Sequence, residues 1–509
     1  MMTPQEFGKI TKNPGSIALT ALPLLAYERF SELCLELCKK GGRIVAYFAR
    51  PQPEGDDLEL FAIIARCWEG ELLILRCTVG RSFPSLTPHC PQLHLFEREI
   101  AEAYGVIPTG HPWFKPVRFH RRWRAGSDAW NRGEERPLPG EMDYYRVEGE
   151  EVHEVAVGPV HAGVIEPGHF RFQCHGENVM HLEISLGYQH RGIEQLLLGG
   201  PHPASIYQLE TVAGDTTAGH ASAYSMVLEA LAGIAPSPRA EAIRAIALEL
   251  ERLSNHVGDI GALAGDVGFL PTASFCGRLR GDYLNLTAEI CGSRFSRGLI
   301  RPGGVGFALD DELAARMLHR LLVIEKETRG AIELFFDAPS ALARMERIGT
   351  LSIDDAEALG MVGVAARACG LTRDVRLHYP YGGYISTYDH CVIEDSGDVF
   401  ARANIRRREI YKSLHWLKQS LRDLPRGELR RELPPLAADT LAVAMVEGWR
   451  GELVQVGITD AAGKFDRYKI IDPSFHNWSG LAMALREQQI SDFPLCNKSF
   501  NLSYCGFDL

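Results

Sequence analysis

Several common functional signatures are missing from this sequence of 509 residues. Its 12 cysteines form no C-x-x-C pair, so the usual spacings of zinc, iron–sulfur and thioredoxin-like sites are absent. There is no G-x-G-x-x-G, P-loop or nucleophile-elbow motif, and nucleotide binding and serine hydrolysis therefore have no support. No apolar run approaches the roughly 20 residues that span a bilayer, and the N-terminus has no signal-peptide core. We expect a chain that is cytosolic or peripheral to a membrane, whose cysteines act as buried hydrophobes.

Positive charge is also scarce. Asp and Glu outnumber Lys and Arg by 65 to 54, which gives a formal net charge of -11. Because phosphate binding needs a basic face, this balance excludes nucleic acid as the main partner. The apolar fraction of 46% and the charged fraction of 23% are typical of a globular protein and exclude a disordered or fibrous chain.

The pattern of residues 1–120 predicts a small α/β domain. Its expected elements are helices at 27–39 and 94–104 and strands at 43–49, 58–67 and 71–79. Residues 121–150 are polar and rich in charge, with Pro and Gly at irregular spacing, which predicts a linker.

Residues 151–509 have a different pattern, which predicts a mainly helical domain. Apolar residues at three-and-four spacing indicate long helices over 240–265 and 313–324. Alternating apolar residues predict a hairpin over 170–186, and a second hairpin is expected over 452–471. The whole chain is therefore predicted to be α+β, with small β elements at the edges of a helical bundle.

Polar motifs interrupt these apolar segments. They are GPVHAG at 158–163, GYQHRGIE at 187–194, GHASAY at 219–224, DVGF at 266–269, RPGG at 301–304 and DPSFHNW at 472–478. Each motif alone is more typical of a structural ion pair or a turn than of a catalytic site.

Taken in order, the motifs of residues 151–509 resemble those of two related families. One is the large catalytic subunit of membrane-bound, energy-converting nickel–iron hydrogenases, including the formate hydrogenlyase type. The other is the D chain of NADH-quinone oxidoreductase (complex I). The first domain resembles the C chain of that oxidoreductase, through FERE at 96–99, YG at 104–105 and GHP at 110–112. The fused C-plus-D layout is that of formate hydrogenlyase large subunits, and it implies a C-chain-like α/β domain followed by a hydrogenase-large-subunit-like helical domain.

The resemblance fails at the metal site. In nickel–iron hydrogenases four thiolates in two C-x-x-C pairs hold the metals, because soft ligands suit them. The resemblance places these ligand positions at Ala213, Thr216, Ser503 and Gly506. Ala and Gly cannot ligate, Ser and Thr hydroxyls are poor ligands for these metals, and Cys505 lies one residue out of register. We therefore expect no nickel–iron centre and no cofactor bound directly by cysteine, with the four positions lining a cavity.

The quinone site that the complex I resemblance implies is also altered. The expected quinone-binding Tyr falls on Gly214 and the expected His on Ile165, whereas the Asp behind that His is present as Asp266. This chain is thus expected to be a third type, with the metal site lost and an unusual site for a quinone.

Two functions stay open. In the first, a redox site beside an iron–sulfur partner reduces a quinone or another small acceptor, and four side chains relay protons: Asp215, His220, Asp266 and His190. In the second, the chain is a catalytically inactive subunit that couples a redox module to a membrane ion pump. Both imply an iron–sulfur small subunit of the complex I B-chain type, H-chain-like and antiporter-like membrane subunits, and a location at the cytoplasmic face of the cell membrane.

Overall fold

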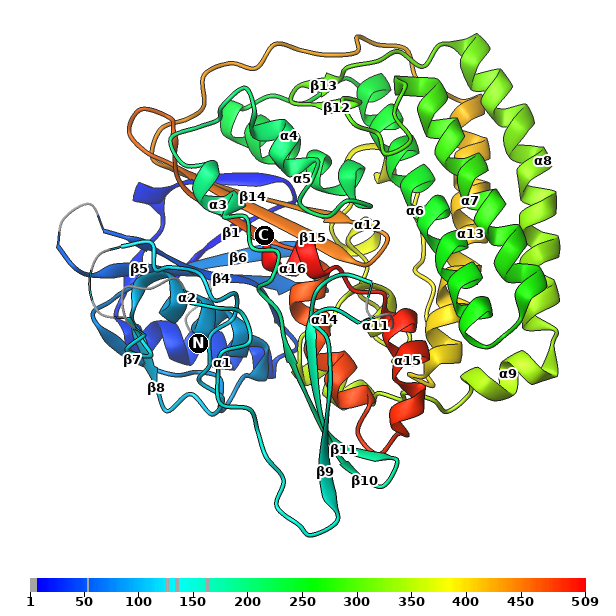
Figure 1. The fold of residues 1–509 in the computed structure, drawn as a ribbon. Coiled ribbons are helices and arrows are strands. Elements are labelled where there is room, and N and C mark those ends of the chain that lie inside the picture. The colour runs from blue at the N-terminus through cyan, green and yellow to red at the C-terminus, as the bar shows by residue number, and fades with distance from the viewer. Residues whose placement is uncertain (1–6, 53–54, 125, 127, 133–136, 162–164) are drawn as a thin grey trace.

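The computed structural model describes residues 7–52, 55–124, 126, 128–132, 137–161 and 165–509 (Figure 1). The N-terminal part is built on a five-stranded sheet with strand order β1-β6-β5-β4, to which β3 is added parallel to β6. Its strands are β1 (Lys9–Thr11), β3 (Leu24–Leu25), β4 (Arg43–Pro51), β5 (Leu58–Arg66) and β6 (Glu71–Val79). Helices α1 (Tyr27–Lys39) and α2 (His94–Tyr104) and the short strands β7 (Ser82–Pro84) and β8 (Ile107–Thr109) complete it.

The two helices of this part begin and end where the sequence predicts. In α1 the buried residues Phe30, Leu33 and Cys34 follow the three-and-four spacing of a single apolar face. Helix α2 ends at Gly105, whose φ of 71° is the left-handed conformation that glycine adopts without steric cost.

The helical part of the molecule is a bundle in which α6, α7, α8 and α13 run side by side (Figure 1). Its main helices are α5 (Thr217–Ala232), α6 (Pro238–Asp266), α7 (Leu270–Cys291), α8 (Asp311–Phe336) and α13 (Val399–Arg422). Helix α6 is buried along most of its length, including the stripe from Ile243 to Leu263 that the sequence predicts. It therefore forms the axis around which the rest of the bundle packs.

A four-stranded antiparallel sheet lies beside this bundle, with strand order β16-β15-β14-β2. Its strands are β2 (Gly15–Ala18), β14 (Thr440–Glu447), β15 (Glu452–Thr459) and β16 (Phe465–Ile471). Strand β2 comes from the N-terminal end of the chain and pairs with residues 440–443. Asn13 strengthens this junction, because its side-chain amide bonds both the N–H and the carbonyl of Met445 at 2.7 and 2.9 Å.

A three-stranded antiparallel sheet projects from the body of the molecule (Figure 1). It consists of β9 (Val152–Val157), β10 (His169–His175) and β11 (Asn178–Ser185). The predicted hairpin is confirmed as β10 and β11, with β9 as an additional edge strand.

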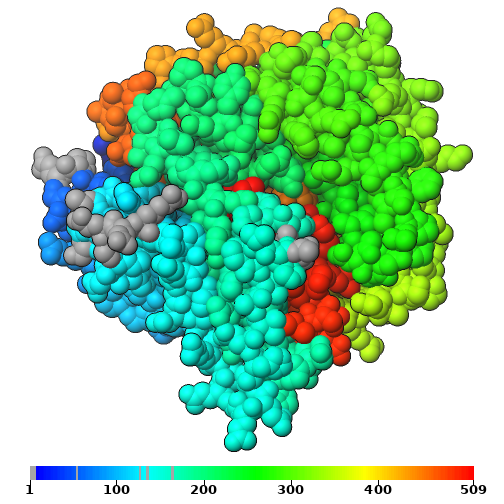
Figure 2. Space-filling model, viewed as in Figure 1, coloured from blue at the N-terminus to red at the C-terminus, as the bar shows by residue number. Residues whose placement is uncertain are grey.

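The remaining elements are short. They are α3 (Ile193–Leu196), α4 (Ser205–Leu209), β12 (Ile300–Arg301), β13 (Gly304–Val305), α9 (Pro339–Met345), α10 (Ile353–Ala358), α11 (Gly363–Arg367), α12 (Val375–His378), α14 (Pro473–Ala484), α15 (Phe493–Phe500) and α16 (Tyr504–Asp508). Figure 2 shows the C-terminal residues, in red, coming to the surface between the cyan and green parts of the chain. This end of the chain is therefore enclosed by segments from both parts of the molecule.

The predicted α+β class is confirmed. The described residues of 121–150 contain no helix or strand, while the predicted boundaries at 120 and 150 stay predictions. All 12 cysteines are free thiols and eight of them are buried, in accord with their expected role as hydrophobes. Within the described residues, no helix is both long and apolar enough to cross a membrane.

Candidate functional site

The two segments that contain Ala213, Thr216, Ser503 and Gly506, the positions that the resemblance aligns with metal ligands, are joined by two arginines. Arg450 donates its Nε to the carbonyl of Asn501 at 2.5 Å and both terminal nitrogens to the carboxylate of Asp215 at 2.6 and 2.8 Å. Arg191 donates to the carbonyls of Val212 at 2.8 Å and Cys505 at 3.1 Å. Each guanidinium therefore joins the loop before α5 to the C-terminal segment of the chain.

Asp215 is an ion-paired carboxylate that still reaches solvent. Its side chain is 32% exposed, whereas that of Arg450 is only 4% exposed. The Asp215 carbonyl accepts hydrogen bonds from Asn255 on α6 at 3.0 Å and from the Trp449 indole at 2.9 Å. The guanidinium of Arg450 lies over the Trp449 ring, 3.9 Å from its centroid. These contacts fix the carboxylate at the edge of the site beside a buried positive charge.

His220 is fully buried in the first turn of α5. Its Nε2 lies 3.3 Å from Oδ2 of Asp472, and the side-chain amide of Gln455 lies 3.4 Å from its Nδ1. Burial tends to raise the pKa of Asp472, but the hydrogen bond and charge of His220, the charge of Arg450 and a hydrogen bond from the Ser474 side chain hold it below its usual value. Asp472 is also the N-cap of α14, so one carboxylate orients both the imidazole and the helix.

A second carboxylate, Glu251, stands behind the loop of Asp215. Its oxygens accept hydrogen bonds from the N–H groups of Ala218 and Gly219 at the start of α5, at 2.7 and 3.2 Å. Burial raises the pKa of Glu251 to about 8, and the negative charge of Asp215 adds to the shift. This carboxyl group is therefore protonated for much of the time at neutral pH.

The four positions that the resemblance aligns with metal ligands are packed against protein atoms. Ala213 and Thr216 are buried. The hydroxyl of Ser503 accepts from the N–H of Gly506 at 2.9 Å, which caps α16. A Cβ atom at Gly506 would lie 2.7 Å from Cγ of Asp472. These residues supply no thiolate, and they do not fit a four-cysteine nickel–iron centre.

The structure separates the residues that the sequence grouped as a proton relay. Asp215 pairs with Arg450 and His220 with Asp472, and neither bonds to the other. Asp266 is exposed at the end of α6 and, among the described residues, forms no hydrogen bond with Asp215 or His220. These three side chains of the expected proton relay thus do not form one hydrogen-bonded network.

His190 lies close to the C-terminus. Its Nδ1 is 2.7 Å from the carbonyl of Asp508, and its ring stacks on that of His120 with centroids 4.7 Å apart. Burial, followed by the charge of His120, lowers the pKa of His190 to about 4. Its imidazole is therefore neutral at physiological pH.

The sequence analysis gave no role to three residues of this site: Arg450, Asp472 and Glu251. Asp472 lies in a motif that the sequence analysis quoted, but its partner His220 is 252 positions away along the chain. Glu251 lies inside the predicted long helix, and nothing in the local sequence indicates that its carboxyl group is buried. Spacing along the sequence could not identify these contacts, because each partner is supplied by the tertiary fold.

A cluster of buried charges adjoins the site. Its members, here called the arginine–glutamate cluster, are Glu249, Arg252, Arg367, Asp374, Arg376, Glu409 and Glu447. Arg252 donates to the carbonyls of Glu447 and Gly448 at 2.7 and 3.0 Å, which anchors the turn that carries Arg450. Burial, followed by repulsion from Asp374, raises the pKa of Glu447 to about 7. The site therefore adjoins a dense network of buried, hydrogen-bonded polar and charged side chains.

Comparison with known proteins agrees with this architecture. Residues 25–138 match the family model of the respiratory-chain NADH dehydrogenase 30 Kd subunit, and residues 266–442 match that of the 49 Kd subunit. In solved structures, the chain is similar to a chain of a membrane-bound sulfane sulfur reductase, an archaeal respiratory membrane complex. That likeness has a TM-score of 0.66 at 23% identity and covers 72% of this chain and 100% of the other, which shows a shared fold.

Curated relatives include hydrogenase and complex I subunits. The carbon monoxide-induced hydrogenase of Rhodospirillum rubrum is 32% identical over 68% of this chain and 96% of its own length. Formate hydrogenlyase subunit 5 of Escherichia coli is 28% identical over 92% of this chain and 83% of its own length. NADH-quinone oxidoreductase subunit 4 of Thermus thermophilus is 30% identical over 70% of this chain and 94% of its own length. The chain therefore belongs to the family of complex I-related and hydrogenase-related large subunits, with its 30-kDa-type and 49-kDa-type parts fused in one polypeptide.

Proposed function

We propose that this chain is the large subunit of the redox module of a membrane-associated, complex-I-like complex, and that it carries an acceptor site without a nickel–iron centre. The relatives support the assembly, since they are subunits of formate hydrogenlyase and NADH-quinone oxidoreductase. The observation that carries the site is the clamp of Arg191 and Arg450, which brings the loop before α5 against the C-terminal segment.

The chemistry that these groups support is reduction of a quinone or another small acceptor by an iron–sulfur partner. Reduction of a quinone adds two electrons and two protons, so the site must stabilise negative charge and supply protons. Arg450 provides a positive charge beside solvent-accessible Asp215. Glu251, with a pKa raised by burial to about 8, holds a proton at neutral pH and can release it. His220 and Asp472 form a second hydrogen-bonded pair behind the C-terminal segment.

Loss of the nickel–iron centre is part of this proposal. The support is chemical, because Ala213 and Gly506 have no donor atom and the Ser503 hydroxyl is engaged in a helix cap. Among the described residues, no group of three His, Cys, Asp or Glu side chains is arranged to hold a metal ion.

The partners that we propose follow from the family. They are an iron–sulfur subunit of the B-chain type, which would bring electrons to the site, and H-chain-like and antiporter-like membrane subunits. A position at the cytoplasmic face of the cell membrane would let the complex pass redox energy to that arm. Obligate contacts of this kind usually bury well over about 2,000 Å².

A second candidate function is structural coupling without turnover. The observation that favours it is the burial and internal hydrogen bonding of the former ligand segments, in which Ser503 caps α16 and the Thr216 hydroxyl lies 3.3 Å from the Asp215 carboxylate. In that case the arginine clamp would transmit movement between a redox partner and a membrane arm.

One experiment separates the two functions. The native complex is purified with its membrane subunits, its clusters are reduced with dithionite, and their re-oxidation by ubiquinone-1 is followed by absorbance. We expect Glu251→Gln to slow re-oxidation at least about tenfold with unchanged subunit composition. The exposed change Glu312→Gln on α8 is the control. Wild-type rates in Glu251→Gln would favour the coupling function, and purification as a lone chain without cluster absorbance would contradict both.

A further inference from the structure

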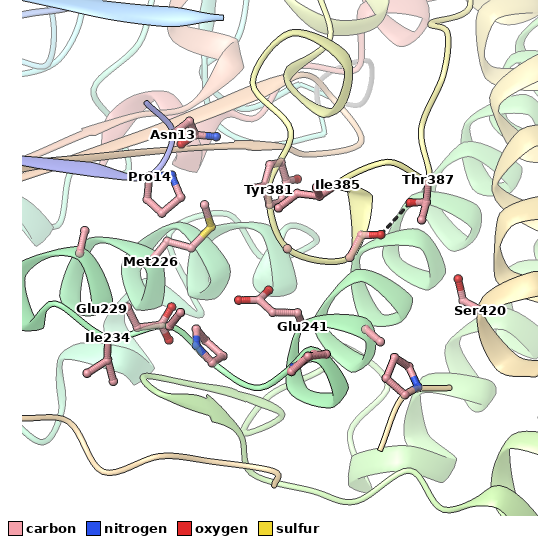
Figure 3. Close-up of a pocket in the computed structure, with 18 of the residues that line it drawn as sticks. Asn13, Pro14, Met226, Glu229, Ile234, Glu241, Tyr381, Ile385, Thr387 and Ser420 are labelled. Atoms are coloured by element: carbon pink, nitrogen blue, oxygen red, sulfur yellow. Dashed lines mark hydrogen bonds between the residues drawn. The ribbon is translucent and has the colours of Figure 1, made fainter. Parts of the chain in front are cut away.

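A large cavity lies outside the site described above and shares no residue with it. Its volume is about 1080 Å³, and it opens between β2, the end of α5, the start of α6, segment 381–387 and the end of α13 (Figure 3). Clefts that hold small molecules typically measure about 300–1,000 Å³, so this cavity has room for a ligand of drug-like size.

The walls of the cavity are mainly apolar and aromatic. They include Pro14, Met226, Ile234, Ile385, Tyr381 and Trp416. Tyr381 and Trp416 are themselves well buried, with exposed fractions of 4% and 7%. Two aromatic side chains that are already fixed by packing can contact an occupant without a large further loss of side-chain entropy.

All charge on the lining is negative. The charged lining residues are Glu229, Glu241 and Asp423, and none of the described residues that line the cavity is Lys, Arg or His. Phosphates, nucleotides and carboxylic acids would meet no counter-charge here. The cavity therefore selects against anions by charge.

The three carboxylates differ in how well they are already paired. Glu229 accepts two hydrogen bonds from Arg244, at 3.0 and 2.5 Å, and a third from the N–H of Gly303 at 2.7 Å. Asp423 is exposed at the end of α13. Glu229 is thus paired with protein groups, and Asp423 is accessible to solvent.

Glu241 is the exception. Its side chain is 24% exposed, and its nearest cationic atom, Nη1 of Arg244, is 3.7 Å away, beyond hydrogen-bond distance. Figure 3 shows its carboxylate projecting into the space between Met226 and Tyr381. Burial raises the pKa of Glu241, the charge of Arg244 opposes this shift, and repulsion from Glu229 adds to it. A partly desolvated carboxylate without a close hydrogen-bond donor is stabilised when a cation binds beside it, because the cation supplies both the opposite charge and the donor.

We propose that this cavity binds an organic cation, an ammonium or guanidinium group on an apolar body, whose charge pairs with Glu241 and whose body packs against Tyr381, Trp416 and Met226. The ammonium group supplies the donors that Glu241 lacks, and the aromatic faces stabilise the same charge. This ligand site is separate from the proposed redox site, so the proposal of cation binding can be tested independently of the proposed acceptor chemistry.

The test is calorimetric titration of the purified full-length chain at pH 7.5 with three probes of similar shape. They are 2-phenylethylammonium, neutral 2-phenylethanol and anionic 3-phenylpropanoate. We expect the ammonium to bind with 1:1 stoichiometry, at least about tenfold more tightly than the other two. This comparison needs no variant, so a folding defect cannot obscure it.

Three variants assign the binding to the cavity. Glu241→Gln should bring the affinity for the ammonium down to that for the alcohol. Glu312→Gln, an exposed acidic change in the first turn of α8, is the matched control and should leave every affinity unchanged. Ala230→Phe, which places a ring in the cavity, should abolish binding of all three probes. Equal affinities for the three probes, undiminished ammonium binding by Glu241→Gln, or no ammonium binding at about 10 mM would overturn the proposal.

Discussion

The guanidinium of Arg450 holds the carboxylate of Asp215 in a bidentate ion pair, with N–O distances of 2.6 and 2.8 Å. This pair joins the turn between β14 and β15 to the loop before α5. Because the same guanidinium also binds the carbonyl of Asn501, it fixes the C-terminal segment as well. A single buried cation thus organises three segments that are far apart in the sequence, and its partners should be sensitive to mutation.

Asp215→Asn should lower the free energy of unfolding by about 1–3 kcal/mol. The reason is that Arg450, whose side chain is 4% exposed, loses the carboxylate of its bidentate ion pair, although the 32% exposure of Asp215 lets water offset part of the loss. Urea unfolding followed by circular dichroism measures the change. Glu32→Gln is the control, because its pair with Arg29 is exposed on both sides and should cost less than about 0.5 kcal/mol. Equal costs for the two variants would contradict the proposed role of the buried pair.

Gly506→Ala should destabilise the chain by about 1–3 kcal/mol, because the added Cβ would lie 2.7 Å from Cγ of Asp472 and would push this carboxylate away from His220. Gly281→Ala provides the contrast. Gly281 lies within α7 and has no atom within 4 Å of an added Cβ, so alanine should stabilise the helix by about 0.5–1 kcal/mol. The measurement is the midpoint temperature of thermal unfolding of both variants relative to wild type. A change of the same sign in both variants would contradict the close packing at Gly506.

The native complex should contain far less than one nickel per chain and should neither evolve nor oxidise hydrogen. The reason is the donor set, since Ala213, Thr216, Ser503 and Gly506 offer no thiolate. Elemental analysis of the purified complex and a hydrogen electrode assay are the measurements. A finding of about one nickel per chain would contradict this prediction and the alignment of the four positions with metal-ligand cysteines.

The sequence predicted the elements whose patterns are local. Helix α1 is confirmed at 27–39 because its apolar face repeats every three to four residues, and α2 at 94–104 because glycine ends it. Strand β9 was not predicted, because its residues VHEVAV do not alternate regularly between apolar and polar and it is a partly exposed edge strand. Strand β2 is only four residues long and pairs with residues 440–443, a contact that no local pattern encodes.

The sequence predicted which segments form the candidate site, because its motifs occur in a recognisable order along the chain. It did not predict which side chains of these segments contact one another. Asp266 was expected to act in the same proton relay as Asp215, yet it is Asp259 of α6 whose carboxylate accepts a hydrogen bond from the Asn501 side-chain amide, at 2.6 Å. Seven residues of helix separate Asp259 from Asp266, a rise of about 10 Å. Asp266 therefore lies beyond the part of α6 that contacts the C-terminal segment. The sequence alone could not show this, because the contact depends on the tertiary structure.

The pKa of Glu251, raised by burial to about 8 from an ordinary value of 4.5, makes folding stability depend on pH. The folded protein keeps this proton up to about pH 8, whereas the unfolded chain loses it near pH 4.5. Between these values the folded state binds more protons, so the free energy of unfolding should fall as pH rises, by at most about 1.4 kcal/mol per pH unit.

Glu251→Gln should remove this contribution, because the amide cannot titrate yet still offers an oxygen to the N–H of Ala218. The measurement is urea unfolding of wild type and variant at pH 5, 6, 7 and 8. The variant should gain stability relative to wild type as pH rises across this range. Glu36→Gln, an exposed change on α1 whose pair with Lys40 lowers the pKa of Glu36, should run parallel to wild type over the same range. Parallel profiles for Glu251→Gln and wild type would show that the buried carboxyl group is already ionised at neutral pH, and would remove it as the proton donor of the proposed acceptor site.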